Sequence, residues 1–251
     1  MTQFTLRLYA ELNDFIPIQN RHKSHLITCD DHCTIKHIIE SLGIPHTEIE
    51  IILANGNSVD YAYIPKSGDY ISVYPVFEAL DISPLLKIRK TVLRKPAFVL
   101  DTHLGKLATY LRMVGLDSIY NNSASDDELA HISSSQNRIL LTKDRGLLKR
   151  KIITHGYIVR NIFPKDQLIE VIHKFDLKRQ LRPFTICLRC NGALVQVDKS
   201  KVSELLEEST LKYYDEFWFC IGCGKLYWKG SHYQSMRLFL DTWVMNCEND
   251  Q

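Results

Sequence analysis

Apolar and polar residues alternate at the start of the chain. Over residues 4–10 every second position is apolar, which predicts a half-buried β-strand. Residues 25–29 can form a second strand that pairs with the first. Apolar residues then recur at helical spacing over 34–43, with Thr34 at the start and Gly43 just after the end. The pattern therefore predicts strand, strand, helix.

Two further strands complete this part of the chain. The apolar run 51–53 leads into Asn55-Gly56, a dipeptide that favours a tight turn. The run 70–74 follows a second turn at 66–69. The order strand, strand, helix, strand, turn, strand is that of a β-grasp. It predicts a small α+β domain over residues 1–80.

This segment resembles the small ubiquitin-like sulfur carriers of thiamine and molybdopterin synthesis. Those carriers end in a free Gly-Gly that becomes a thiocarboxylate, whereas this chain passes through Phe77-Glu78-Ala79-Leu80 into more protein. The carrier chemistry has no atom to act on here. We expect a binding or docking domain for a protein partner that the sequence does not identify.

The middle of the chain has a different periodicity. Short apolar runs that predict buried strands alternate with helical patterns. The expected strands are 97–100, 116–120, 139–142 and 157–160. A helix is expected between the first two, because residues 104–114 show one apolar face and Gly115 ends it. Such β-α-β alternation predicts a parallel sheet with right-handed crossovers.

Two of these strands are each followed by an aspartate. Asp101 ends the run 97–100, and Asp144 comes shortly after the run 139–142. A third acidic group, Asp126 to Glu128, opens a helix. Because parallel strands end at one edge of a sheet, these acids are expected to converge there and bind Mg²⁺ or Mn²⁺, which prefer oxygen ligands. Such ions bind phosphate oxygens and favour phosphoryl transfer.

Each of these acids except Asp101 also has a structural interpretation as an alternative to metal binding. Ser125 and Glu128 form a helix capping box, and acids in a first turn complement the helix dipole. Asp127 fits either role. Asp144 precedes a glycine by two positions, where aspartate is common in turns. Asp101 is harder to explain structurally, because a carboxylate at the end of a buried strand gains little from burial.

Basic residues crowd the same stretch of sequence. The candidates for binding a nucleic-acid backbone are Lys143, Lys149, Arg150 and Lys151. Arg145 lies next to Asp144, where it would either neutralise a phosphate or pair with a carboxylate. A metal site within a positive surface suits a nuclease, because the cations hold the polyanion.

Two cysteine pairs lie near the end of the chain. Cys187 and Cys190, and Cys220 and Cys223, form two CxxC motifs about thirty residues apart, the ligand set of a zinc ribbon. The alternative is two disulfides or unrelated thiols. A closed four-sulfur site has no open coordination position, so this Zn²⁺ is expected to be structural. Aromatic residues around the second pair would stack on unpaired bases or fill the small core beside the metal.

Charge is uneven along the chain. Residues 1–80 contain 5 Lys/Arg and 10 Asp/Glu, a balance of −5, and residues 81–251 contain the other 26 and 19, a balance of +7. The basic part suggests a polyanionic partner. The basic stretch 81–95 predicts a linker, either a solubilising hinge or a phosphate contact. The 7 cysteines leave three without pairing logic, which favours the reducing cytoplasm. No transmembrane-length apolar run or secretory leader is expected.

Several long stretches resemble the Mut-seven C-terminal ribonuclease family. They are VLDTHLGKLATYLRMVGLDS, ILLTKDRGLLKR, THGYIVR, PFTICLRCNGALV and YDEFWFCIGCGKLYWKGSHYQSM. The likeness implies a PIN-like core, a zinc ribbon and metal-dependent RNase activity. By motif match it assigns Asp101, Asp126 and Asp144 as the metal-binding acids. Many PIN domains have a fourth acid after the next strand, and residues 157–161 offer none.

These observations predict an α/β PIN-like domain that follows a ubiquitin-like domain and precedes a zinc ribbon. The expected segments are a ubiquitin-like domain at 1–80, a basic linker at 81–95, a PIN-like nuclease domain at 96–181, a zinc ribbon at 182–236 and a C-terminal tail at 237–251. The expected function is metal-dependent hydrolysis of RNA. The alternative is an RNA-binding or ribosome-associated adaptor whose PIN-like core lacks turnover.

Overall fold

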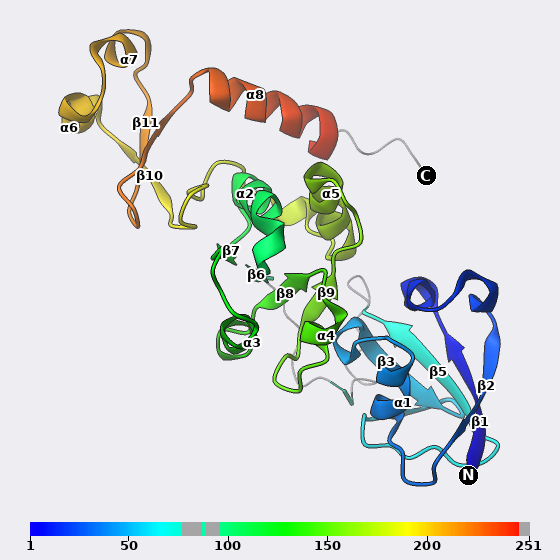
Figure 1. Ribbon diagram of the computed structural model, residues 1–251. Helices are drawn as coiled ribbons and strands as arrows, with labels where there is room; N and C mark the ends of the chain where they lie inside the picture. Colours follow the sequence, from blue (N-terminus) through cyan, green and yellow to red (C-terminus); the bar gives the residue numbers. More distant parts are fainter. Residues whose placement is uncertain (77–86, 89–95, 246–251) are drawn as a thin grey trace. The chain divides into compact units, whose positions relative to one another are not determined.

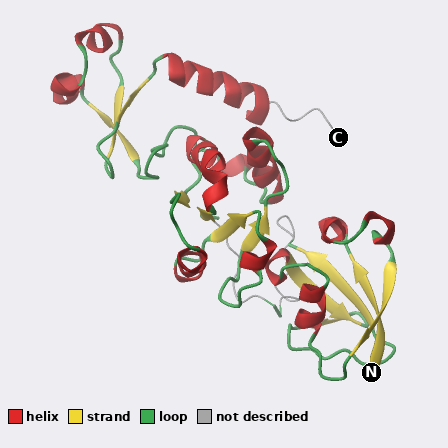
Figure 2. Cartoon of the chain, viewed as in Figure 1, coloured by secondary structure: helices red, strands yellow, loops and turns green. Residues whose placement is uncertain are grey.

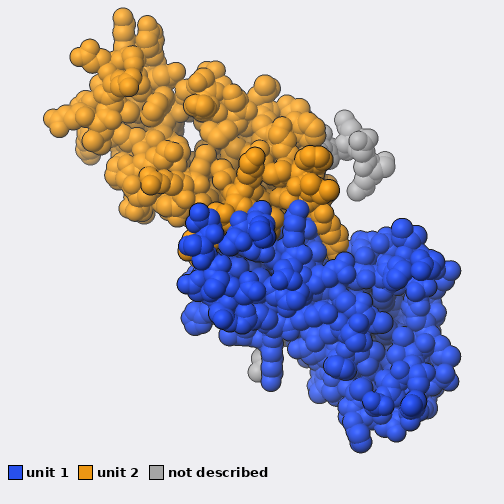
Figure 3. Space-filling view, viewed as in Figure 1, with its two compact units in different colours: residues 1–103, 122–159 blue, residues 104–121, 160–251 orange. Residues whose placement is uncertain are grey.

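The computed structural model describes residues 1–76, 87–88 and 96–245. These residues form two compact units that do not follow chain order (Figure 3). Unit 1 comprises residues 1–103 and 122–159, and unit 2 comprises the rest. Each unit is described separately below. The predicted linker 81–95 lies outside the described residues, apart from Lys87 and Ile88.

The first part of unit 1 is the predicted β-grasp (Figure 1). Its strands are β1 (Thr2–Leu8), β2 (Ser24–Cys29), β3 (Ile49–Ala54), β4 (Asn57–Val59) and β5 (Tyr70–Pro75). They form one sheet in the order β2-β1-β5-β3-β4. β1 pairs antiparallel with β2 and parallel with β5, which places the first and last strands side by side in the sheet. Helix α1 (Ile35–Ser41) and the 3-10 helices η1 (Ala10–Phe15), η2 (Ile18–Asn20) and η3 (His46–Glu48) join these strands.

Local sequence accounts for the elements of the β-grasp. The alternating positions Phe4, Leu6 and Leu8 are all buried on one face of β1. Helix α1 begins where the side chain of Thr34 accepts a hydrogen bond from the main-chain N–H of His37. It ends at Ser41, and Gly43 follows the C-cap Leu42 with a φ of +91°, a conformation that L residues rarely adopt. The predicted helix and its two end signals are therefore confirmed.

The second part of unit 1 is a parallel sheet. Strands β6 (Phe98–Leu100), β8 (Ile139–Thr142) and β9 (Gly156–Ile158) are paired in parallel in that order. The residues of these three strands are all buried, as expected for a parallel sheet covered on both faces. Helix α3 (Asp126–Ser135) leads into β8, and α4 (Arg145–Leu148) follows β8 before β9; helices are red and strands yellow in Figure 2. The parallel arrangement predicted from the β-α-β alternation is confirmed.

The β-grasp contributes side chains to the outer edge of β9. The main-chain N–H of Val159 points to β8 and donates to Thr142, whereas that of Ile158 donates to Oε1 of Glu48 at 2.6 Å. Nε2 of the buried His46 lies 2.9 Å from the carbonyl oxygen of Ile153. These contacts satisfy main-chain groups that an open sheet edge leaves unpaired.

Unit 2 combines helices of the predicted PIN-like region with the cysteine-rich segment. It contains α2 (Gly105–Met113), β7 (Ser118–Tyr120), α5 (Pro164–Lys174), η6 (Lys178–Gln180), α6 (Lys199–Val202), η7 (Ser203–Leu205) and α7 (Glu208–Tyr213). The 3-10 turn η5 (Thr102–Leu104) leads into α2. Strands β10 (Leu194–Val197), β11 (Phe217–Cys220) and β12 (Leu226–Trp228) form an antiparallel sheet in that order, which is the body of the predicted ribbon.

A long helix follows the ribbon. Helix α8 (Ser231–Leu240) continues into the π-helical turn η8 (Asp241–Met245), so the segment 237–251 that we predicted as a tail begins as helix. Its aromatic residues explain why. Phe239 stacks on Tyr110 of α2 at a centroid distance of 5.3 Å, and the Lys165 ammonium of α5 lies 5.0 Å from the Phe239 ring. In the described part of the chain, no helix has the length and apolar character needed to cross a membrane.

Candidate active site and metal centre

Asp101 lies at the carboxyl end of β6 and is only 8 % exposed. Its Oδ2 accepts a 2.6 Å hydrogen bond from the hydroxyl of Thr142, the last residue of β8. Its Oδ1 accepts a 3.1 Å hydrogen bond from the hydroxyl of Thr102. Both of these donors are neutral, so the hydrogen bonds orient the carboxylate without neutralising its charge.

Asp144 is joined to Asp101 through the same hydroxyl. The main-chain N–H of Asp144 donates to Thr142 Oγ1 at 2.9 Å, while that hydroxyl donates to Asp101. The Asp144 side chain is exposed and accepts a 2.6 Å hydrogen bond from the main-chain N–H of Gly146, which caps the start of α4. The turn role that we considered for Asp144 is therefore observed. The ends of β6 and β8 meet, as the parallel sheet requires.

The third acidic group opens α3. The Ser125 side chain accepts from the main-chain N–H of Glu128, and the Glu128 side chain accepts from the main-chain N–H of Ser125, so the capping box is confirmed. Asp127 forms an ion pair with Arg150. Asp126 occupies the first helical position and is exposed. Of these acids, Asp126 is the one for which no capping contact or ion pair is observed among the described residues.

The three predicted metal-binding acids do not form a compact cage. Within the described residues, the four cysteines are the one group of three or more His, Cys, Asp or Glu ligand atoms lying within 4.8 Å of one another. Asp101, Asp126 and Asp144 therefore do not meet that spacing together. Their oxygen atoms fit Mg²⁺ or Mn²⁺ in kind, and Mg²⁺ commonly binds one or two carboxylates while water and phosphate supply its other ligands.

The basic residues expected near the acids have varied surroundings. The Arg145 guanidinium lies 5.0 Å from the centroid of the Phe15 ring, which belongs to the β-grasp. Lys149 Nζ donates to the carbonyl oxygen of Glu40 at 2.7 Å. Arg150 pairs with Asp127. Lys143 and Lys151 are exposed. Three of these five cations thus have partners within unit 1.

Sequence reasoning missed two polar residues, Thr142 at the end of β8 in unit 1 and Glu170 of α5 in unit 2. Thr142 was assigned to β8 without a role, although a threonine two residues before Asp144 was a signal for a hydroxyl at the sheet edge. Glu170 of α5 accepts hydrogen bonds from the main-chain N–H groups of Arg160 and Asn161. Glu170 lies too far along the chain to be found from strand ends alone, and its contacts are structural.

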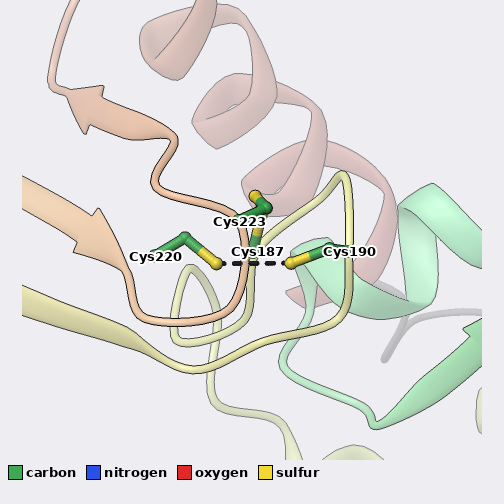
Figure 4. Close-up of side chains that lie close together, drawn as sticks. All are labelled: Cys187, Cys190, Cys220 and Cys223. Atoms are coloured by element: carbon green, nitrogen blue, oxygen red, sulfur yellow. Dashed lines mark hydrogen bonds between the residues drawn. The ribbon is translucent and has the colours of Figure 1, made fainter.

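The four predicted zinc ligands converge in unit 2. Cys187 and Cys190 lie on one knuckle and Cys220 and Cys223 on the other, and all four sulfur atoms lie within 4.8 Å of one another (Figure 4). The Sγ–Sγ distances are 3.7 Å for Cys187 and Cys223 and 3.3 Å for Cys190 and Cys220. A tetrahedron of Zn–S bonds has edges of about 3.8 Å. The thiol spacing therefore fits Zn²⁺.

Neighbouring groups favour thiolate at one of these sulfurs. Burial acts to raise the pKa of Cys187, but hydrogen bonds from Tyr227, Cys190 and Arg189 outweigh it and lower that pKa to about 6. The Tyr227 hydroxyl lies 3.1 Å from the sulfur, and the other two donors are main-chain N–H groups. Burial and the neighbouring thiols raise the pKa of Cys190. Neighbouring negative charges repel one another, so these four thiols are not expected to ionise together without a cation. A bound Zn²⁺ would stabilise all four thiolates.

Glycines leave room for the sulfur cluster. A Cβ on Gly192 would lie 3.1 Å from the sulfur of Cys220, and one on Gly222 would lie 3.3 Å from that of Cys190. The knuckle turns also place Asn191 and Gly224 at positive φ, +67° and +72°. The local sequence thus provides both the ligands and the close backbone approach of a metal knuckle.

Family comparisons cover both parts of the chain. The family model described as the Mut7-C RNAse domain matches residues 96–240, and the one described as Mut7-C ubiquitin matches residues 1–81. The chain belongs to the Mut7-C RNAse domain family and has the N-terminal ubiquitin-like domain in addition. The fold and the family resemblance predicted from the sequence are confirmed. No curated protein matches the chain significantly.

Solved structures match the N-terminal domain. Small archaeal modifier protein 1 of H. volcanii is 16% identical over 30% of this chain and 98% of its own, with a TM-score of 0.25. A putative molybdopterin converting factor subunit 1 from Pyrococcus furiosus is 14% identical over 30% and 98%, also with a TM-score of 0.25. These scores are too low to support any argument about function. The β-grasp assignment depends on the strand order and the family match.

Proposed function

We propose that the protein is a metal-dependent ribonuclease that hydrolyses RNA phosphodiester bonds at the carboxyl ends of β6 and β8. Membership of the Mut7-C RNAse domain family supports this class of activity. The observation that carries the proposal is the linked pair Asp101 and Asp144, which one threonine hydroxyl joins across two strand ends. Carboxylates at that edge of a parallel sheet are well placed to meet a ligand.

Asp101 is the central residue of this site. It is almost fully buried, and the two threonine hydroxyls that bind it carry no positive charge. A buried carboxylate with neutral donors is costly in free energy unless a cation joins it. In the proposal Asp101 and Asp144 hold a Mg²⁺ or Mn²⁺ ion, and Asp126 supplies a third carboxylate to the site. When bound, such an ion lowers the pKa of water and offsets charge on the phosphate.

The cations of unit 1 supply the proposed contacts to RNA. Lys143 and Lys151 are exposed and available to phosphate oxygens, and Arg150 would exchange its pairing with Asp127 for a phosphate. Lys149 and Arg145 lie close to Asp144 in sequence and would contact phosphates of the same RNA strand. Their present contacts with Glu40 and Phe15 would change or loosen on RNA binding.

The other parts have supporting roles in this proposal. The four cysteines hold a structural Zn²⁺, because their spacing fits the ion and leaves no open position. The ubiquitin-like domain serves as a docking module for a protein partner. Cys29 and Cys33 are free thiols, consistent with a reducing compartment such as the cytoplasm.

An RNA cleavage assay tests the proposal. The wild-type protein is incubated with structured RNA in Mg²⁺, Mn²⁺ or EDTA beside the variants Asp101→Asn and Asp144→Asn. We expect cleavage with either ion, none in EDTA, and a loss of about 100-fold or more in each variant, because amides bind hard cations poorly. Asp127→Asn is the matched control, since Asp127 lies in the acidic group but pairs with Arg150.

Two results would contradict the proposal. Cleavage that persists in both aspartate variants would remove Asp101 and Asp144 from the chemistry. RNA retention without cleavage in any sample would favour the alternative function, an RNA-binding or ribosome-associated adaptor. The observation that supports this alternative is that the three acids do not form a group with all ligand atoms within 4.8 Å of one another.

A further inference from the structure

A buried arginine of the nuclease region lies beside the cysteine cluster within unit 2. Arg112, in the last turn of α2, is only 4 % exposed. Its Nε donates to the carbonyl oxygen of Ser118 at 2.9 Å. Its Nη1 donates to the carbonyl oxygens of Leu188 and Arg189 at 3.1 Å and 3.0 Å. The guanidinium therefore binds three main-chain carbonyls, which carry no formal charge.

A buried guanidinium needs negative charge nearby. Burial lowers the pKa of Arg112, so its charged form is stable here only with compensating partners. A Zn²⁺ ion with four thiolate ligands has a formal charge of −2. Because Arg112 binds the carbonyls of the two residues between Cys187 and Cys190, the metal-loaded cluster would supply compensating charge beside it.

The two carbonyls have a second significance. Leu188 and Arg189 are the middle residues of the first CxxC knuckle, so each carbonyl shares a peptide group with the N–H of the next residue. Those N–H groups, of Arg189 and Cys190, are the two main-chain donors to the sulfur of Cys187. These two peptide groups therefore each accept a hydrogen bond from Arg112 at the carbonyl and donate one to the Cys187 sulfur at the N–H. Aligned hydrogen bonds of this kind polarise one another.

We propose that Arg112 is a positioning residue of the zinc centre. It holds both peptide groups of the first knuckle in the orientation that directs their N–H groups at Cys187, and it balances the charge of the loaded cluster. Metal retention by the ribbon then depends on helix α2, and the order of α2 depends on the metal. This coupling is a property of the zinc centre and is independent of whether the acidic site cleaves RNA.

The contacts between the knuckle and β7 support the same coupling. Asn191, which follows Cys190, donates from Nδ2 to the Asp117 carboxylate at 2.6 Å and accepts from the main-chain N–H of Ser118 at 2.8 Å. The carbonyl of Ser118 in turn accepts from Arg112. Hydrogen bonds therefore join α2 and β7 to the first knuckle both between its two cysteines and just after them.

Zinc transfer to a chromophoric chelator tests the proposal on the full-length, zinc-loaded protein. We expect Arg112→Met to release zinc about 10-fold to 100-fold faster than the wild type, the range typical for groups that orient metal ligands. Arg112→Lys keeps the positive charge but loses the planar fork of N–H donors, so its rate of zinc release should lie between those of Arg112→Met and the wild type. Arg189→Met is the matched control, because its exposed side chain leaves but its carbonyl remains.

A second measurement keeps the test decisive if Arg112→Met does not fold. Hydrogen exchange of the wild type is compared with and without zinc. Loss of protection in the last turn of α2 and in β7 on zinc removal, with α3 of unit 1 unchanged, is the expected result. Zinc release from folded Arg112→Met at the wild-type rate, or α2 protection that is indifferent to zinc, would overturn the proposal. A wild-type protein that never holds zinc would refute the metal centre itself.

Discussion

The hydroxyl of Thr142 connects the two acids on which the proposed chemistry depends. The residue is fully buried at the end of β8, where its hydroxyl donates to the Asp101 carboxylate and accepts from the main-chain N–H of Asp144. A single hydroxyl can do both because it has one donor and two lone pairs. The positions of two acids that are 43 residues apart in sequence therefore depend on one side chain.

Replacing Thr142 with valine should disturb both partners. Valine has a similar shape, so the change removes the hydroxyl and leaves a buried carboxylate and an N–H group short of a partner. We expect the free energy of unfolding to fall by about 1–3 kcal/mol and metal-dependent cleavage to fall with it. Thr142→Ser keeps the hydroxyl and should retain most activity. Urea unfolding and RNA cleavage measure the two effects, and a Val variant equal to wild type in both would contradict this role.

At the scale of elements, the first turn of α3 shows a competition between structural and chemical roles. The capping box of Ser125 and Glu128 uses one of three consecutive acids for helix initiation, and Arg150 pairs with the second. Asp126 is left at the exposed first helical position. The capping box therefore fixes the direction in which the helix presents Asp126.

The cap can be removed without touching Asp126. Ser125→Ala should lower the free energy of unfolding by about 1 kcal/mol, because one N–H at the helix start loses its acceptor. Glu128→Gln preserves the reciprocal hydrogen bond and should have a smaller effect. Hydrogen exchange in the first turn of α3 provides the measurement. Equal protection in the alanine variant and the wild type would mean that the cap does not hold this turn.

Periodicity and end signals predicted most elements but not the distances between them. The alternation in β1 and the turn glycine after α1 are local signals, and the structure confirms both. Whether Asp126 meets Asp101 and Asp144 within 4.8 Å depends on how α3 lies beside the sheet, which no local pattern encodes. Helix α8 was missed because its aromatic contacts are with α2 and α5, far away in sequence. The cysteine cluster was predictable because CxxC spacing itself determines the knuckle geometry.

At the scale of the whole molecule, the compact units cut across the nuclease region. Helix α2 and strand β7 belong with the ribbon in unit 2, whereas the three parallel strands belong with the β-grasp in unit 1. The domain order predicted along the chain did not anticipate this division. It depends on tertiary contacts such as those of Arg112 and Asn191 with residues more than 70 positions away.

Loss of the metal should therefore affect more than the knuckles. Cys190→Ser removes one of four ligands, and we expect the variant to lose about one zinc per chain together with the fold of the ribbon. Cys33→Ser, which removes a half-buried thiol of the β-grasp, is the control and should retain zinc. Elemental analysis and circular dichroism give the readouts. A Cys190→Ser protein with full zinc content would show that the four sulfurs are not the ligand set.

The central claim is that Asp101 and Asp144 hold a divalent cation at the carboxyl ends of β6 and β8. Anomalous scattering from crystals soaked in Mn²⁺ tests it most directly, because it locates the ion independently of activity. The account predicts an Mn²⁺ peak about 2.1 Å from an Asp101 carboxylate oxygen, with Asp144 as a direct or water-mediated neighbour. It also predicts that the peak is absent in Asp101→Asn. Mn²⁺ bound only elsewhere, or bound equally in Asp101→Asn, would contradict the account.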